Sequence, residues 1–168
     1  NVQNNLVDNA WFGRKNIFNI EKEKSWEVME NKINFPKKKN KTWQKYVDEN
    51  RLEITCGEAP YLVSRYDTVS GKPIELNERI GILDRKMRIV NENTNNEKEW
   101  LKWSERAFQS TYGFEFQGDS LLIARENLLA SYCDYIEYKL QREPTEFELL
   151  KIAKIISWNL WQMDGLTY

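Results

Sequence analysis

The stretch DSLLIARENLLASYCDYIEYKLQREPTEFELLKIAKIISWNLWQMDG, residues 119–165, decides the fold class. Its apolar residues recur with the 3.6-residue period of an α-helix on both sides of a short break at 141–144. The Thr-Glu-Phe-Glu run at 145–148 has the form of a capping box, in which threonine and glutamate side chains satisfy free backbone N–H groups at a helix start. Two antiparallel helices are therefore predicted, and the second, apolar around most of its circumference, is expected to be the buried central helix.

Upstream of this stretch, the helical period continues, and further helices are predicted from Asn77 and from Asn95 or Asn96. Ser70-Gly71 lies between β-forming segments, so a small β-hairpin is expected between about residues 54 and 76. Residues 1–50 carry isolated aromatic residues and are expected to form an irregular extension that docks through them. The prediction is a mainly α single compact domain, with an N-terminal extension at 1–50 and a helical domain with a small hairpin at 51–168.

Composition excludes several classes of function. The 168 residues suit one domain and carry a net charge of -1, so any contact with nucleic acid has to be a local patch. The absence of histidine excludes Ser/His/Asp and Cys/His nucleophile systems and imidazole-ligated zinc. Two cysteines are too few for a disulfide framework, and seven glycines leave no glycine-rich phosphate loop. No catalytic residue, metal site or cofactor is therefore predicted.

The location expected from the sequence is the cytoplasm. The chain has no uncharged apolar run of about 18 residues, so no membrane span is predicted. No basic segment followed by an apolar one opens the chain, so no signal peptide is predicted either.

One alternative function is a Mg²⁺-dependent nuclease. Asp84-Arg85-Lys86, with Asp67 upstream, matches a loose pattern in which two carboxylates hold Mg²⁺ and a lysine steadies the attacking water. That chemistry favours a strand through Asp84 and Lys86, whereas the apolar residues around them recur at helical intervals. A solvated, charged helix face is the interpretation that the period favours.

The segment Thr55-Cys56-Gly57-Glu58-Ala59-Pro60-Tyr61 superficially resembles the N-P-P-Y tetrapeptide with which amino-methyltransferases hold a flipped base. Ala59 replaces the first proline and Glu58 the asparagine. Because no glycine-rich loop for S-adenosylmethionine is present, methyl transfer from this chain is not expected. Cys56 has no histidine to activate it, so a turn with a small buried cysteine is the favoured interpretation.

Two groups of residues are candidates for binding nucleic acid or a protein partner. The aromatic residues Tyr112, Phe114 and Phe116 are predicted to lie in a loop between two helices, where rings stack on bases or anchor a partner. Lysines beside aromatic residues and arginines on a helix face can follow a phosphate backbone. These basic and aromatic candidates are Lys37, Lys38, Lys39, Lys41, Lys45, Trp43, Tyr46, Arg79, Arg85, Lys86 and Arg88.

Eight segments together resemble a bacterial and phage family commonly labelled restriction endonuclease subunit M. They are LEITCGEAPY (52–61), SRYDT (64–68), RIG (79–81), LDRK (83–86), WLKW (100–103), STYGFE (110–115), QGD (117–119) and ISWNLWQMDG (156–165). The resemblance covers residues 50–165 approximately. It implies a modification subunit acting on DNA.

The function expected from the sequence is a non-catalytic binding protein of the conflict between phages and bacterial restriction and defence systems. Its partner is expected to be DNA or a DNA-processing nuclease complex, with the chain serving as an accessory restriction-modification subunit or as a phage inhibitor such as an anti-CRISPR protein. The two alternatives are the nuclease described above and a phage protein-interaction module that does not contact nucleic acid.

Overall fold

The computed structural model describes residues 2–23 and 25–164 and is mainly helical, as predicted. Within this part of the chain, the α-helices are α1 (Val2–Phe12), α2 (Trp43–Asp48), α3 (Ile82–Asn93), α4 (Glu97–Gln109), α5 (Gly118–Leu140) and α6 (Glu146–Asn159), with a 3-10 turn η1 (Leu76–Glu78). No helix in it combines the length and apolar content that a membrane span requires.

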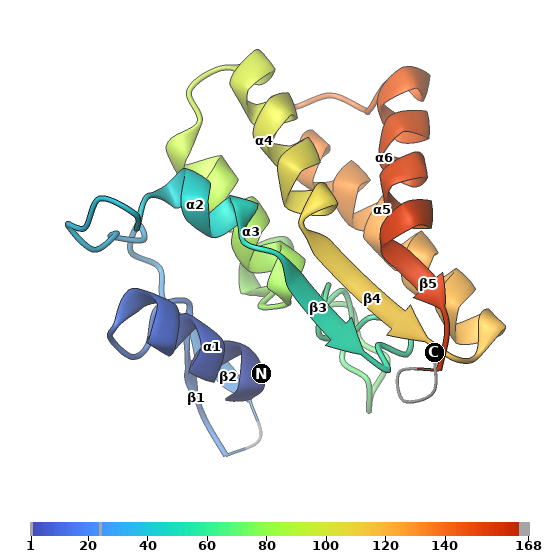
Figure 1. Cartoon of the computed structure of the whole chain (residues 1–168), viewed down its shortest axis with the longest axis horizontal. Coiled ribbons are helices and arrows are strands. Elements are labelled where there is room, and N and C mark those ends of the chain that lie inside the picture. The colour runs from blue at the N-terminus through green and yellow to red at the C-terminus, as the bar shows by residue number, and fades with distance from the viewer. Residues whose placement is uncertain (1, 24, 165–168) are drawn as a thin grey trace.

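A parallel sheet of three short strands packs against α5, which lies behind it in Figure 1. The strands are β3 (Arg51–Ile54), β4 (Thr111–Glu115) and β5 (Leu160–Gln162), in the order β3-β4-β5. β4 follows directly after α4 and its cap residue, and β5 follows directly after α6. All three strands therefore end at the same edge of the sheet.

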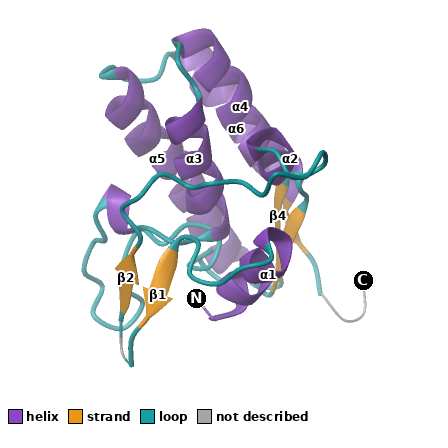
Figure 2. Cartoon of the chain, turned by 90° about the vertical axis from the view of Figure 1, so that its left-hand side faces the viewer, coloured by secondary structure: helices purple, strands orange, loops and turns teal. Residues whose placement is uncertain are grey.

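The antiparallel hairpin lies nearer the N-terminus than predicted. β1 (Asn19–Glu21) pairs with β2 (Trp26–Val28), and Figure 2 shows this hairpin beside α1. In the segment 54–76 the Ser70-Gly71 turn forms, but the pairing is reduced to one bridge between Tyr66 and Pro73. The β-forming residues before it are used instead in β3, which pairs with β4 sixty residues away.

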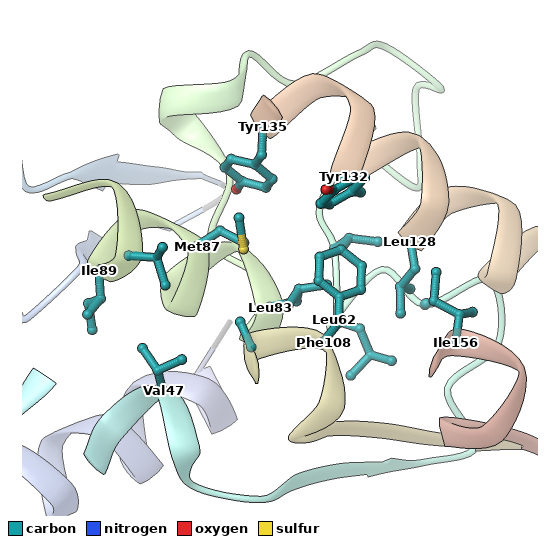
Figure 3. Packing of buried hydrophobic residues seen from close by; sticks show 14 of the residues in the cluster. Val47, Leu62, Leu83, Met87, Ile89, Phe108, Leu128, Tyr132, Tyr135 and Ile156 are labelled. Carbon is teal, nitrogen blue, oxygen red and sulfur yellow. The ribbon is translucent and has the colours of Figure 1, made fainter. Parts of the chain in front are cut away.

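The core is built around α3, and the prediction that the last helix is central is wrong. Seven residues of α3 are buried, whereas α6 buries Ile152, Ile156 and Asn159 and exposes Phe147 and Leu150. Figure 3 shows how Leu83 and Met87 of α3 meet the apolar side chains of α4 and α5. The ring of Phe12, the fully buried Val47 and the other buried residues of the first 50 belong to the same core, so the N-terminal segment docks as expected.

The predicted capping box at the start of α6 is confirmed, and it makes stability depend on pH. The Glu148 carboxylate accepts the Thr145 N–H at 2.7 Å, and Arg142 donates to the same carboxylate at 2.7 and 3.0 Å. The hydrogen bond from Arg142 lowers the pKa of Glu148 from 4.5 to about 2. A carboxyl group whose pKa is lower in the folded state stabilises the fold above its unfolded pKa.

We therefore expect the stabilisation from Glu148 to be complete above about pH 4.5 and to disappear as the pH falls toward about 2. Urea unfolding at about pH 6 and about pH 3 measures this effect. The loss of unfolding free energy between the two pH values should be smaller in Glu148→Gln than in the natural chain. An equal loss in both proteins would contradict the assignment, and Glu143→Gln serves as the control.

Candidate functional site

The Asp84-Arg85-Lys86 stretch lies in the interior of the molecule, on α3. Their exposed fractions are 1%, 2% and 1%. A buried cation cannot reach a phosphate backbone while α3 stays folded. The prediction that Arg85 and Lys86 bind DNA or a partner from a solvated helix face is therefore wrong.

Asp84 joins the start of α3 to α5. One carboxylate oxygen accepts the backbone N–H groups of Ser64 at 2.8 Å and Gly81 at 3.0 Å, and the other accepts the Tyr135 hydroxyl at 2.9 Å. Burial raises the pKa of Asp84, because a low-dielectric interior disfavours the charged form. These contacts satisfy backbone groups at a helix start, which is a structural role.

Lys86 joins the ends of two other helices. Its ammonium group donates to the carbonyl oxygens of Glu49 at 2.6 Å and Ser110 at 2.9 Å, the residues that follow α2 and α4. A cation there offsets the negative end of each helix dipole. Burial lowers the pKa of Lys86 well below its ordinary value. The side chain is therefore committed to holding α2 and α4 against α3.

The other charged candidates are also held by structural contacts. Arg79 pairs with Asp134 at 2.6 Å and Arg88 pairs with Glu92 at 2.8 Å. Asp67 accepts the backbone N–H of Ser70 at 2.7 Å within its own turn. The structure thus gives the two carboxylates and the lysine of the nuclease alternative separate partners. No group of three or more potential metal ligands forms in the described residues.

A cleft of about 790 Å³ lies between β2, η1, α3 and α5. Its size is in the range of small-molecule sites. The charged groups that line it, among them Arg79, Arg88 and Asp84, are already engaged in the pairs described above. Its lining cations are therefore committed to other partners, and the exposed carboxylates of Glu30 and Glu78 are among the charged groups that these pairs leave out.

Tyr112 and Phe114 lie on β4 rather than in a loop. Their side chains lie on the same face of the sheet as Leu52 and Ile54 of β3 and Trp161 of β5. Ile54, Phe114 and Trp161 are paired in register across the three strands. Leu52, Ile54 and Trp161 are 45%, 53% and 49% exposed. In Figure 1 no element covers the near face of these strands. Parallel sheets usually carry helices on both faces, so this apolar face is unusual for a parallel sheet.

The carboxyl edge of the sheet gathers the loops that follow β3, β4 and β5. In open sheets of parallel strands, ligands bind outside the carboxyl ends of the strands. Glu115, the last residue of β4, is 6% exposed and bridges two of these loops. Its two oxygens accept the backbone N–H groups of Gly57 at 2.7 Å and Gln117 at 3.0 Å. Phe116, the next residue, is 69% exposed.

The loop after β3 has a backbone conformation that usually requires glycine. Thr55, Gly57 and Ala59 have φ values of 61°, 55° and 67°. The left-handed region is rare for residues other than glycine, and its use marks turns and ligand-binding segments. The sequence predicts a turn with a small buried cysteine here, which the 2% exposure of Cys56 confirms, but not the left-handed backbone at Thr55 and Ala59. The signal that could have revealed it is a short β-forming run followed at once by Thr-Cys-Gly.

The edge loops carry acidic side chains and no basic ones. Residues 55–60, 115–119 and 162–164 contain Glu58, Glu115, Asp119 and Asp164, and neither lysine nor arginine. Burial raises the pKa of the Cys56 thiol to about 11, so Cys56 is a packed thiol rather than a nucleophile. A ligand at this edge would thus meet the carboxylates of Glu115 and Asp119, the loop backbone and the Phe116 ring.

The predicted lysines of the N-terminal segment stay at the surface. Lys37, Lys38 and Lys39 are exposed, and Trp43 packs against Trp103 of α4 with ring centroids 4.8 Å apart. Among the described residues, candidates therefore meet solvent at the carboxyl edge of the sheet, on its open face and in this lysine segment. No known protein family, curated protein or solved structure matches the chain, so these sites are interpreted from their own geometry.

Proposed function

We propose that the carboxyl edge of the sheet binds a nucleoside-type cofactor of the S-adenosylmethionine class. The observation that carries the proposal is the position of Glu115, a carboxylate fixed at the end of β4 directly before the exposed ring of Phe116. In dinucleotide-binding sheets of parallel strands, an acidic side chain accepts hydrogen bonds from the ribose hydroxyl groups of the ligand.

Glu115 has the hydrogen-bonding capacity for this role. A carboxylate has about four lone-pair positions, and the two backbone N–H groups of the neighbouring loops use two of them. The remaining positions suit the two adjacent hydroxyl groups of a ribose. Because both N–H donors hold the carboxylate in place, it needs no reorganisation on binding. The Phe116 ring, next in sequence, offers a flat apolar surface on which a base can stack.

The charge of the edge favours a cationic ligand over a phosphorylated one. Dinucleotides and nucleoside triphosphates bring several negative charges, which the carboxylates of Glu58, Glu115 and Asp119 would repel. A sulfonium or ammonium group is attracted by the same carboxylates. An adenosine that carries a sulfonium group therefore fits the edge better than a nucleotide.

The resemblance to the restriction endonuclease subunit M family supports the same proposal, since it implies a subunit that modifies DNA. S-Adenosylmethionine supplies the methyl group in such reactions. The base-binding tetrapeptide is replaced in this sequence, by Glu58-Ala59-Pro60-Tyr61. The proposal is therefore cofactor binding, with the groups that hold the base supplied elsewhere. The function expected from the sequence, a non-catalytic binding protein that serves as an accessory restriction-modification subunit or a phage inhibitor, is the alternative hypothesis.

We expect Phe116→Ala to weaken S-adenosylmethionine binding by about tenfold, because stacking of one base contributes about 1–3 kcal/mol. Glu115→Gln removes the charge and one of the acceptor positions and should weaken binding by at least about tenfold. Isothermal titration calorimetry with S-adenosylmethionine, S-adenosylhomocysteine and ATP measures both effects. S-Adenosylhomocysteine, which lacks the sulfonium charge, should bind more weakly, and ATP should not bind.

Phe147→Ala is the matched control, because this ring is 74% exposed on α6 and lies outside the edge loops. It should leave the affinity unchanged. Thermal melting of each variant shows whether the loops remain folded. Failure of the natural chain to bind S-adenosylmethionine, or equal affinities in all variants, would overturn the proposal.

A further inference from the structure

A second surface has the opposite charge. Residues 32–45 contain six lysines and no acidic residue, in a chain whose net charge is -1. We define the lysine surface as Lys37, Lys38, Lys39, Lys41 and Lys45 of this segment together with Lys102 of α4. Lys37, Lys38, Lys39 and Lys45 are exposed, and no ion pair involves them within the described residues.

Two lysines of this surface lie over aromatic rings. The ammonium group of Lys41 lies 4.2 Å from the ring centroid of Trp11, and that of Lys102 lies 5.7 Å from the ring centroid of Trp103. Trp103 in turn meets Trp43 at 4.8 Å. Cation–π contacts of this length fix lysines in position while keeping their charge. Lys41 is therefore held by Trp11, and Lys102 lies over a ring that packs on Trp43 of the lysine segment.

The backbone of the segment is also ordered by local hydrogen bonds. The Lys38 N–H donates to the Pro36 carbonyl at 2.7 Å, and the Lys41 N–H donates to the Lys38 carbonyl at 3.0 Å. The Thr42 side chain caps α2 directly after it. The lysines are thus presented by consecutive turns instead of a flexible tail, and less entropy is lost when they meet a partner.

We infer that the lysine surface binds the phosphate backbone of a nucleic-acid strand. Repeated phosphates are the partner that a row of unpaired lysines neutralises, and each neutralised phosphate adds salt-dependent affinity. An anionic membrane is less suitable, because the neighbouring rings Trp11, Phe35, Trp43 and Trp103 are partly buried and pack on the core instead of projecting outward. The partial exposure of the same rings leaves room for contact with bases at their edges.

This inference is independent of the nucleoside proposal, because the two surfaces share no residue and have opposite charge. Its test is fluorescence anisotropy with labelled single-stranded and duplex oligonucleotides of about 16 nucleotides, over a series of salt concentrations. The variant is Lys38→Glu with Lys39→Glu. The control is Lys72→Glu with Lys154→Glu, which changes the net charge equally at two exposed lysines on other elements.

For the natural chain, a plot of log affinity against log salt concentration should have a slope of about -2 or steeper. In the Lys38/Lys39 variant this slope should be shallower by about two, and the affinity should fall on the order of tenfold or more. The Lys72/Lys154 variant should bind like the natural chain. Whether single strands or duplexes bind more tightly identifies the form of nucleic acid. Equal losses in both double variants, or tighter binding to phosphatidylserine vesicles or inorganic polyphosphate than to oligonucleotides, would overturn the inference. S-Adenosylmethionine binding should be unaffected in either variant.

Discussion

Replacement of Arg85 by methionine is expected to destabilise the folded chain by about 3–5 kcal/mol, because it leaves a buried carboxylate without its main partner. The Arg85 guanidinium pairs with the Asp8 carboxylate of α1 at 2.6 Å, and their side chains are 2% and 3% exposed. It also donates to Asn5 at 2.8 Å and to the Ile80 carbonyl at 2.8 Å. A loss of this size is a large part of the 5–15 kcal/mol by which domains are usually stable.

The measurement is chemical denaturation of Arg85→Met, Asp8→Asn and the double variant. The two single losses should not add, since both changes break the same ion pair, and the double variant should lose less unfolding free energy than the sum of the two single losses. Arg51, 3.6 Å from the Asp8 carboxylate, is unchanged in all three variants. Lys151→Met is the control, because Lys151 pairs with Glu105 at 2.6 Å from a side chain that is 49% exposed. It should cost less than about 1 kcal/mol. An Arg85→Met protein as stable as the control would show that α1 is not held by this ion pair.

This ion pair also explains which parts of the fold could be predicted from the sequence. The cap at Thr145 and the start of α4 after Asn96 depend on residues three or four positions apart, and both are found as predicted. The partners Asp8 and Arg85 are 77 positions apart. Nothing local to Arg85 indicates that a carboxylate from α1 will cover it, so the residue looks like part of a solvated face.

The same reasoning applies to the choice of central helix. The last helix has more apolar residues than α3, yet α3 is the one buried all around. The polar residues of α3 are buried because Ser64, Glu49 and Ser110, far away in the chain, satisfy them. Counting apolar residues cannot reveal such partners.

The parallel sheet could not be predicted from local sequence patterns, for a related reason. β3, β4 and β5 are three to five residues long, and their paired residues are about 50 or more positions apart. Neither the length of the apolar runs nor the turn residues between them therefore predicts a sheet. The sequence pattern therefore predicts a loop with aromatic residues around Glu115 rather than the end of a strand. Its importance becomes visible when the strands end side by side and Gly57 donates to it.

Gly81→Ala is expected to be the most damaging single-atom change in the chain. A Cβ at position 81 would lie 2.4 Å from the Leu62 carbonyl oxygen and 2.6 Å from its carbon, and both are backbone atoms that cannot rotate away. The φ of -62° is suitable for any residue, so the cost is steric and not conformational. The Leu62 carbonyl also accepts the Leu83 N–H at 2.8 Å, so the clash disturbs the first turn of α3.

We expect Gly81→Ala to lower the unfolding free energy by about 3 kcal/mol or more, as overpacking of a rigid site does. Gly118→Ala is the matched control, since its Cβ would meet nothing closer than 3.5 Å. It should change stability by less than about 0.5 kcal/mol. Urea unfolding of the two variants measures the difference. Equal stability of the two variants would mean that the backbone around Leu62 shifts to admit the extra carbon. The expected difference would identify the junction of Leu62, Gly81 and Asp84 as a rigid part of the core, because a Cβ there has no other place to go.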